Sequence, residues 1–284
     1  MHAAERHSTQ LAGRGRCELN DSRSIDASAC LKHRREIALA TCISDTAFCA
    51  FQGVLPMRSR TLLILSALAV VAIWQLPYGK QILYPLTLFA AFAHEMGHGL
   101  TAMLLGQQFD QLRLYADGSG LALWYGDPGR LARALIATGG LVGPGFAGIG
   151  LLLLAPTPRR ARAVLVGLAA VIVITVALWV RNPFGIVFLL VLAGFLGLAA
   201  RVLPDYGAAF LISFVAVTLC LSWFADLDYM FSAYAEVDGG RHPSDSAIIA
   251  QALWLPYWFW GGIVALFSFA VLTLGLLWAA RRSA

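Results

Sequence analysis

Two histidines four residues apart flank a glutamate in the run His94-Glu95-Met96-Gly97-His98. On an α-helix, residues four apart lie on one face about one turn from each other, so both imidazoles point the same way. Two imidazoles at this spacing can bind one Zn²⁺ ion, and the glutamate between them can act as general base toward a water molecule on that ion. The run therefore predicts a metal-dependent hydrolytic site with His94 and His98 as ligands and Glu95 as the catalytic residue.

This run lies inside an apolar segment that extends from about Gln81 to Leu105, as expected of a membrane-spanning helix. A carboxylate at bilayer depth is costly and is retained where it has a partner or a function. The alternative interpretation is a set of buried polar residues that join helices through hydrogen bonds. The metal-binding spacing of all three polar side chains favours the metal site.

A catalytic zinc site needs a third protein ligand and keeps its fourth position for water. In soluble proteases with three histidines, a glycine follows the second histidine at three residues and another histidine comes three later. Here those positions hold Thr101 and Leu104. That class of protease is therefore excluded, and the third ligand must come from a distant part of the chain.

Composition indicates a membrane protein that crosses the bilayer several times. The 284 residues are 59% hydrophobic and only 13% charged, whereas soluble domains carry about 25% charged residues. The net charge of +5 is modest, and the arginines gather at the ends of apolar segments. That pattern is typical of membrane helices, so we expect a lipid bilayer as partner and no nucleic acid. The five cysteines have irregular spacing, which favours free thiols.

The chain divides near Met57. Residues 1–56 lack a sustained apolar period, whereas Met57 and two nearby arginines precede the first apolar run, as a natural start would. We expect residues 1–56 to be a wrongly assigned upstream extension or a disordered tail, and residues 57–284 to be the transmembrane domain. The predicted fold is all-α and polytopic, with about seven apolar spans near residues 61–78, 81–105, 130–155, 161–180, 184–203, 207–225 and 253–280.

A short β-hairpin is expected after the second span. Two apolar runs, 109–115 and 121–125, flank an Asp117-Gly118 pair, which is a frequent turn sequence. Such a hairpin beside the metal helix can offer a strand edge to an extended substrate peptide. The alternative is a plain connecting loop.

At the level of families, the run from His94 to Ala102 with the following Gly106 resembles the motif helix of the site-2 protease family, in particular its compact M50B-like branch of intramembrane zinc metalloproteases. The hairpin region, the glycine-rich third span and the late Ser244-Asp245-Ser246 run resemble that branch as well, so the likeness covers about residues 57–278. It implies Zn²⁺ as cofactor, His94 and His98 as ligands and Glu95 as base. It also implies a membrane-embedded or membrane-proximal protein substrate and an integral, multi-pass location in a bacterial-type cell membrane.

The chain departs from this family at the third ligand. Members usually supply an aspartate from an Asn-Pro-x-Asp-Gly or Leu-Asp-Gly setting, but residues 182–185 read Asn-Pro-Phe-Gly. Asp245 is our first candidate, although it can also cap the helical run 247–253 that follows it. Asn182 could instead hold substrate backbone or the motif helix. The other candidate ligands are Asp205, Asp226 and Asp228.

Two further interpretations remain open. A prenyl-protein type of membrane protease also uses His-Glu-x-x-His, but it needs a downstream glutamate ligand, and Glu236 in a polar loop is the last glutamate of the chain. Alternatively, the missing aspartate after Asn182-Pro183 marks a catalytically impaired pseudoprotease that serves as a scaffold. We favour the active zinc endopeptidase.

Overall fold

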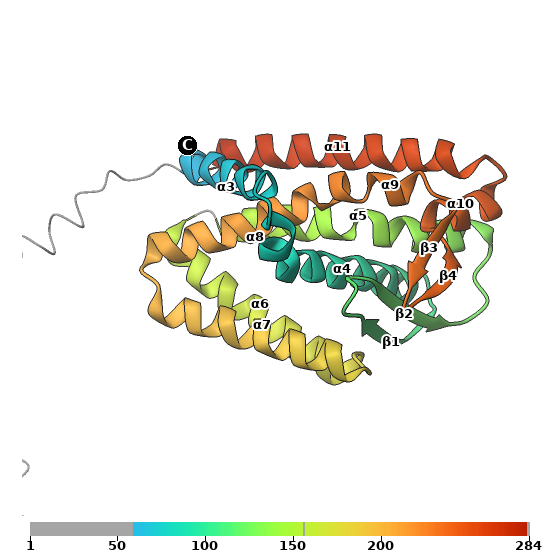
Figure 1. The fold of residues 1–284 in the computed structure, drawn as a ribbon, viewed down its shortest axis with the longest axis horizontal. Helices are drawn as coiled ribbons and strands as arrows, with labels where there is room; N and C mark the ends of the chain where they lie inside the picture. Colours follow the sequence, from blue (N-terminus) through green and yellow to red (C-terminus); the bar gives the residue numbers. More distant parts are fainter. Residues whose placement is uncertain (1–58, 156, 283–284) are drawn as a thin grey trace, which may run out of the picture. The chain divides into compact units, whose positions relative to one another are not determined.

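The computed structural model describes residues 59–155 and 157–282. The expected extension, residues 1–56, lies outside the described residues, so that expectation stays a prediction. Figure 1 follows the described chain through its helices and strands. These are α3 (Ser59–Trp74), α4 (Gly79–Leu104), β1 (Gln108–Leu114), β2 (Gly120–Tyr125), α5 (Arg130–Leu154), α6 (Pro158–Leu178), α7 (Pro183–Val202), α8 (Asp205–Ala225), α9 (Leu227–Met230), β3 (Tyr234–Val237), β4 (Gly240–Pro243), α10 (Asp245–Leu253) and α11 (Tyr257–Arg282).

Most of the described chain is helical, as predicted, and a long helix occupies each expected apolar span. Five helical segments in the described ranges are long and apolar enough to cross a membrane. They are α5, α6, α7, the continuous stretch over α8 and α9, and the first part of α11. The other two, α3 and α4, do not meet that description, because α3 has 16 residues and α4 carries the polar motif. The expected number of seven spans is therefore not confirmed.

Proline sets the start of three neighbouring helices. Pro158 and Pro183 occupy the first turn of α6 and α7, and Pro204 directly precedes α8. Proline fits the first helical turn because its fixed φ suits the helix. Amide groups in this turn have no acceptor within the helix, so proline, which has no amide hydrogen, costs no hydrogen bond there. These positions keep the connections short, so α6, α7 and α8 fold back on one another and share a buried apolar cluster with α4 and β1.

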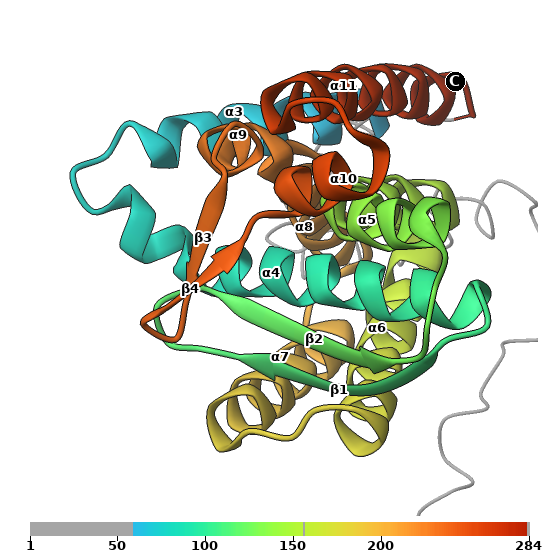
Figure 2. The same cartoon turned by 90° about the vertical axis from the view of Figure 1, so that its right-hand side faces the viewer.

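The predicted hairpin after α4 is confirmed. Strand β1 pairs antiparallel with β2, from Gln108 opposite Tyr125 to Leu114 opposite Gly120. At the turn, the Ser119 amide donates to Asp117 Oδ1 at 2.9 Å, and Gly118 has a φ of +96°, which favours glycine. In Figure 2 the hairpin lies along α4, on the side opposite α5 and α10.

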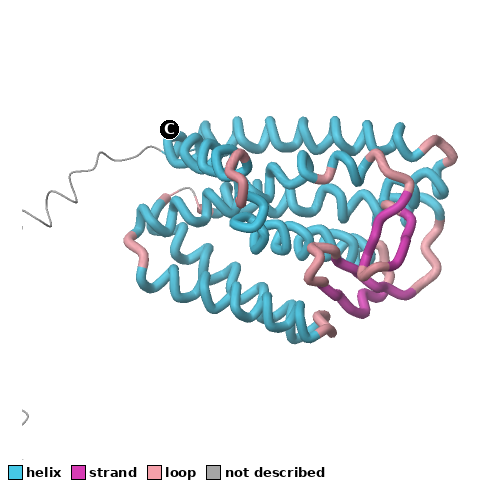
Figure 3. Tube along the Cα trace, in the orientation of Figure 1, coloured by secondary structure: helices cyan, strands magenta, loops and turns pink. Residues whose placement is uncertain are grey.

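A second hairpin, β3 with β4, occupies the polar stretch before α10 and was not predicted. Its strands have four residues each, and its turn places Asp238 and Gly239 at positive φ. Strands this short carry little alternation of apolar and polar residues, so the pattern that indicates a strand was too weak to detect. Figure 3 shows that both hairpins lie at the same end of the helices.

The Asn182 side chain holds the first hairpin and not the motif helix. Its Oδ1 accepts from the Leu114 amide at 3.1 Å, and its Nδ2 donates to the Leu114 carbonyl. Two residues earlier on β1, the Leu112 amide donates to the Trp179 carbonyl at 2.8 Å, and the Leu112 carbonyl accepts from the Arg181 amide at 3.1 Å. The junction of α6 and α7 therefore pairs with the outer edge of β1 as a third strand would.

We expect Asn182→Ala to lower the free energy of unfolding by about 1–3 kcal/mol, because it leaves the Leu114 amide and carbonyl without their partner. Thermal or denaturant unfolding in detergent measures this. Gln111→Ala is the matched control: its side chain also bears an amide, but bonds only to the Arg113 side chain, so a change within about 0.5 kcal/mol is expected. Equal stability of Asn182→Ala and the wild type would contradict the role of this clamp.

Candidate metal centre

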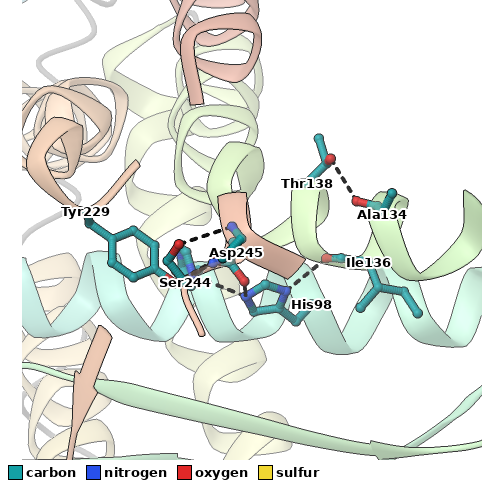
Figure 4. Close-up of polar contacts among 9 residues, drawn as sticks. His98, Ala134, Ile136, Thr138, Tyr229, Ser244 and Asp245 are labelled. Atoms are coloured by element: carbon teal, nitrogen blue, oxygen red, sulfur yellow. Dashed lines mark hydrogen bonds and ion pairs between the residues drawn. The ribbon is translucent and has the colours of Figure 1, made fainter. Parts of the chain in front are cut away.

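His94 and His98 meet on one face of α4, as their spacing predicts. Their Nε2 atoms lie 3.1 Å apart, and their rings stand edge to face with centroids 4.8 Å apart. The Nδ1 atom of His98 lies 2.8 Å from the carbonyl oxygen of Ile136 on α5 (Figure 4). A carbonyl only accepts, so Nδ1 carries the proton and the Nε2 lone pair stays free for a metal.

Asp245 completes a group of three at the start of α10. Its Oδ2 lies 3.0 Å from His94 Nε2, and its Oδ1 lies 3.3 Å from His98 Nε2. The N-cap of α10 is Ser244, whose hydroxyl accepts from the Ala247 amide at 3.2 Å. Because a neighbouring side chain caps the helix, the Asp245 carboxylate is available to face the histidines, as Figure 4 shows.

The other candidate aspartates lie apart from this group. Asp205 pairs with Arg162 at 2.9 Å at the start of α8, and the Asp228 side chain is exposed. Asp226 lines a cavity next to His94 without joining the group. Among the described residues, the side chains that lie close enough together to hold a metal ion are those of His94, His98 and Asp245, called the metal-ligating group below. Our first candidate for the third ligand is therefore the carboxylate that the fold places beside the two imidazoles.

The donor set fits a zinc ion. One ligand atom from each residue lies within 4.8 Å of the others, and Asp245 is only 4% exposed. Burial raises the pKa of the Asp245 carboxyl, but the adjacent imidazoles of His98 and His94 outweigh burial and hold this pKa below its usual range. Two imidazole nitrogens and one carboxylate oxygen would supply three protein ligands, the number that catalytic zinc sites use.

Glu95 lies beside the metal-ligating group and faces the first hairpin. It is 7% exposed. Gly120 at the start of β2 leaves room for it, because a Cβ atom at that position would lie 2.8 Å from Glu95 Oε1. The sequence analysis missed this role of Gly120, because it depends on how the hairpin packs on α4. A carboxylate next to a metal ligand has the position that a general base needs.

Two cavities reach the site. The larger cavity has a volume of about 490 Å³ and contacts His94 and Glu95. It is lined by residues 83–95 of α4, the end of α8, α9 and β3. The smaller, about 210 Å³, contacts all three members of the metal-ligating group and Glu95 from the side of β2 and the second hairpin. The site is therefore buried within the protein yet bordered by space large enough for water and a peptide segment.

Glycines on α5 let this helix approach α4 closely. A Cβ atom at Gly140 would overlap the His98 ring, and one at Gly97 would overlap the Gly139 carbonyl. Only a glycine backbone brings α5 near enough for its Ile136 carbonyl to reach His98. The α4–α5 contact therefore orients one candidate ligand of the site.

Gly140→Ala is expected to displace the His98 ring, weaken metal binding, and cost about 1–3 kcal/mol through overpacking. Metal content per chain and thermal unfolding measure the two effects. Gly150→Ala on the same helix is the matched control, because a Cβ atom there has no neighbour within 4 Å. Wild-type metal content in Gly140→Ala would show that the close approach does not orient His98.

A bundle of apolar helices that encloses two histidines and an aspartate beside a buried glutamate defines the class of this protein, an integral-membrane protein with a metalloenzyme-like site. Residues 63–275, about three quarters of the chain, match the sequence profile of the Peptidase M50B-like family. The chain belongs to this family, which indicates a membrane metalloprotease. No curated protein and no solved structure matches the chain.

Proposed function

We propose that the chain is a zinc-dependent intramembrane endopeptidase that cuts a membrane-embedded or membrane-proximal protein. The observation that supports this most is the group of His94, His98 and Asp245 next to Glu95 in a peptidase-family chain. These three side chains would hold the ion. Zinc, when bound, supplies Lewis acidity that polarises a carbonyl and acidifies water.

Glu95 is the residue that moves the proton. It accepts a proton from the attacking water as the water oxygen bonds to the carbonyl carbon of the scissile peptide. It then gives that proton to the leaving amine as the carbon–nitrogen bond breaks. Its burial limits access of bulk water to these steps, and Gly120 leaves the room that the Glu95 side chain occupies.

Hydrolysis at this depth needs a supply of water, and the larger cavity is suited to deliver it. Thr218 and Ser222 on α8 and Asp226, the residue that caps its C-terminus, recur every four residues, and all three line that cavity. Thr87 of α4 lines it as well. Polar groups of this kind stabilise water by hydrogen bonds where an apolar wall does not, so we assign this face of α8 to water access.

The free edge of β2 is suited to hold the substrate backbone. Antiparallel partners alternate between bonded and non-bonded pairs. Leu112 and Leu114 bond outward to the α6–α7 junction, so their partners Ala122 and Gly120 direct their backbone groups away from β1. The Glu95 side chain lies against Gly120 at the start of this edge. An extended peptide added to this edge would bring its backbone to the catalytic carboxylate.

The enzyme proposal outweighs the pseudoprotease alternative on the evidence of Asp245. That alternative rested on the missing aspartate after Asn182-Pro183, but Asp245 places a carboxylate within 3.0 Å of His94 Nε2. In this proposal the protein is an integral, multi-pass protein of a bacterial-type cell membrane, its partners are a membrane-protein substrate and the bilayer, and nucleic acid is not a partner.

Comparative membrane proteomics of cells that produce wild-type or Glu95→Gln protein tests the function. The substrate is expected to accumulate uncut with Glu95→Gln and to appear as fragments with the wild type. Identical membrane proteomes, together with no cleavage by purified zinc-loaded protein, would overturn the protease proposal and favour the scaffold.

A further inference from the structure

Tyr229 on α9 bonds twice to the aspartate of the site. Its hydroxyl donates to Asp245 Oδ2 at 2.9 Å and accepts from the Asp245 amide at 3.2 Å, as Figure 4 shows. Its ring also stands edge to face against His94, with centroids 6.0 Å apart. One side chain thus touches the aspartate through its polar end and a histidine through its ring.

The segment that carries Tyr229 is held firmly in place. The neighbouring Met230 is fully buried, and its carbonyl packs directly on Gly261 of α11, where a Cβ atom would overlap it. The Ser244 hydroxyl donates to the Ser232 carbonyl at 2.6 Å, and the Ser244 amide donates to Ala233 at 3.2 Å. Residues just after α9 are therefore tied to the residue just before Asp245.

We infer that Tyr229 is a positioning residue that orients Asp245 as the third metal ligand; the inference rests on the proposed metal site. A phenol hydroxyl has one proton to donate, and here the proton goes to Asp245 Oδ2. The hydroxyl is therefore engaged with the ligand and is not aimed at substrate. Partners of this kind fix the ligand's orientation, and their loss typically weakens metal binding about 10–100-fold.

A direct catalytic role is the competing explanation, because Tyr229 lines both cavities. A tyrosine that donates to the developing oxyanion would lower turnover and leave metal affinity unchanged. A tyrosine that orients Asp245 would lower metal affinity and change the ligand field of the bound ion. The two roles therefore predict opposite results for metal binding.

The test compares Tyr229→Phe with the wild type in the full chain. Zn²⁺ affinity is measured by competition with a chelator, and the visible spectrum of Co²⁺-loaded protein reports the ligand geometry. We expect about 10–100-fold weaker Zn²⁺ binding and an altered Co²⁺ spectrum. Tyr84→Phe is the matched control, because it removes a hydroxyl that donates to the Ala116 carbonyl at 2.6 Å, away from the site; its affinity and spectrum should equal those of the wild type.

Wild-type affinity and spectrum in Tyr229→Phe would overturn the inference, and a loss of turnover alone would assign Tyr229 to catalysis instead. A second measurement covers the case in which Tyr229→Phe unfolds more readily. If Tyr229 acts through Asp245, the substitution should lower the unfolding temperature of the metal-free protein less in an Asp245→Ala background than in the wild type. An equal loss in both backgrounds would also overturn it. None of these readouts needs proteolysis, so failure of the protease proposal is distinguishable from failure of this inference.

Discussion

Glu95→Gln is expected to lower peptide-bond cleavage by about 10²–10⁴-fold, the usual contribution of general acid–base catalysis, while the zinc content remains that of the wild type. The amide of glutamine has nearly the shape of the carboxylate but cannot take the proton of the attacking water. His94, His98 and Asp245 are unchanged, so the metal-ligating group remains intact. Steady-state cleavage of a membrane substrate and metal analysis of the same preparation measure both quantities.

Glu236→Gln is the matched control for this result. Glu236 is exposed on β3 and lines the same large cavity, but it lies outside the metal-ligating group. Near-wild-type cleavage is expected of this variant. Full turnover in Glu95→Gln would remove Glu95 from the mechanism, and loss of zinc from that variant would show that Glu95 is instead needed to retain the metal.

Asp245→Ala is expected to reduce zinc from about one ion per chain, as a site of this kind holds, to a small fraction of that value, and to abolish cleavage with it. The substitution leaves two imidazoles as the ligands and removes the anionic donor that offsets part of the metal's charge. It also removes the partner of the Tyr229 hydroxyl. Metal analysis after gel filtration, with and without added zinc, measures the loss.

Two other aspartates provide controls for the third ligand. Asp228→Ala removes an exposed carboxylate and Asp226→Ala removes one that borders the site. Both lie at the end of α8 or just beyond it, and neither belongs to the metal-ligating group, so both variants should retain zinc. Zinc retained by Asp245→Ala and lost from Asp226→Ala would assign the third ligand to Asp226.

The sequence was most informative where the signal is local. Hydropathy along the chain located the long helices, and the turn chemistry of Asp117-Gly118 located the first hairpin, because both depend on residues close together in the chain. The second hairpin escaped prediction because its strands are only four residues long. The sequence predicted seven membrane spans, whereas five helical segments of the described chain are long and apolar enough to cross a membrane. The two that differ are α3, which has 16 residues, and α4, which carries the polar motif.

Asn182 also shows that a contact between distant parts of the chain cannot be predicted from local sequence. The Asn-Pro run was identifiable, but its task depends on which backbone lies opposite it after folding. Its two hydrogen bonds go to Leu114, far away in the sequence. The roles of Gly120 and Gly140 at the site also depend on the fold, because the absence of a side chain matters only where a particular neighbour, Glu95 or His98, fills the space.

The sequence alone determined the candidate base and two of the candidate ligands, because helical periodicity places His94 and His98 on one face with Glu95 beside them. Only the tertiary structure shows which of the four candidate aspartates lies beside these histidines. That placement depends on the packing of α5, α9, α10 and α11 around one apolar cluster, which brings Asp245 Oδ2 to 3.0 Å from His94 Nε2. Spacing within a helix is a local geometric constant, whereas the approach of distant helices follows from the packing of the whole bundle.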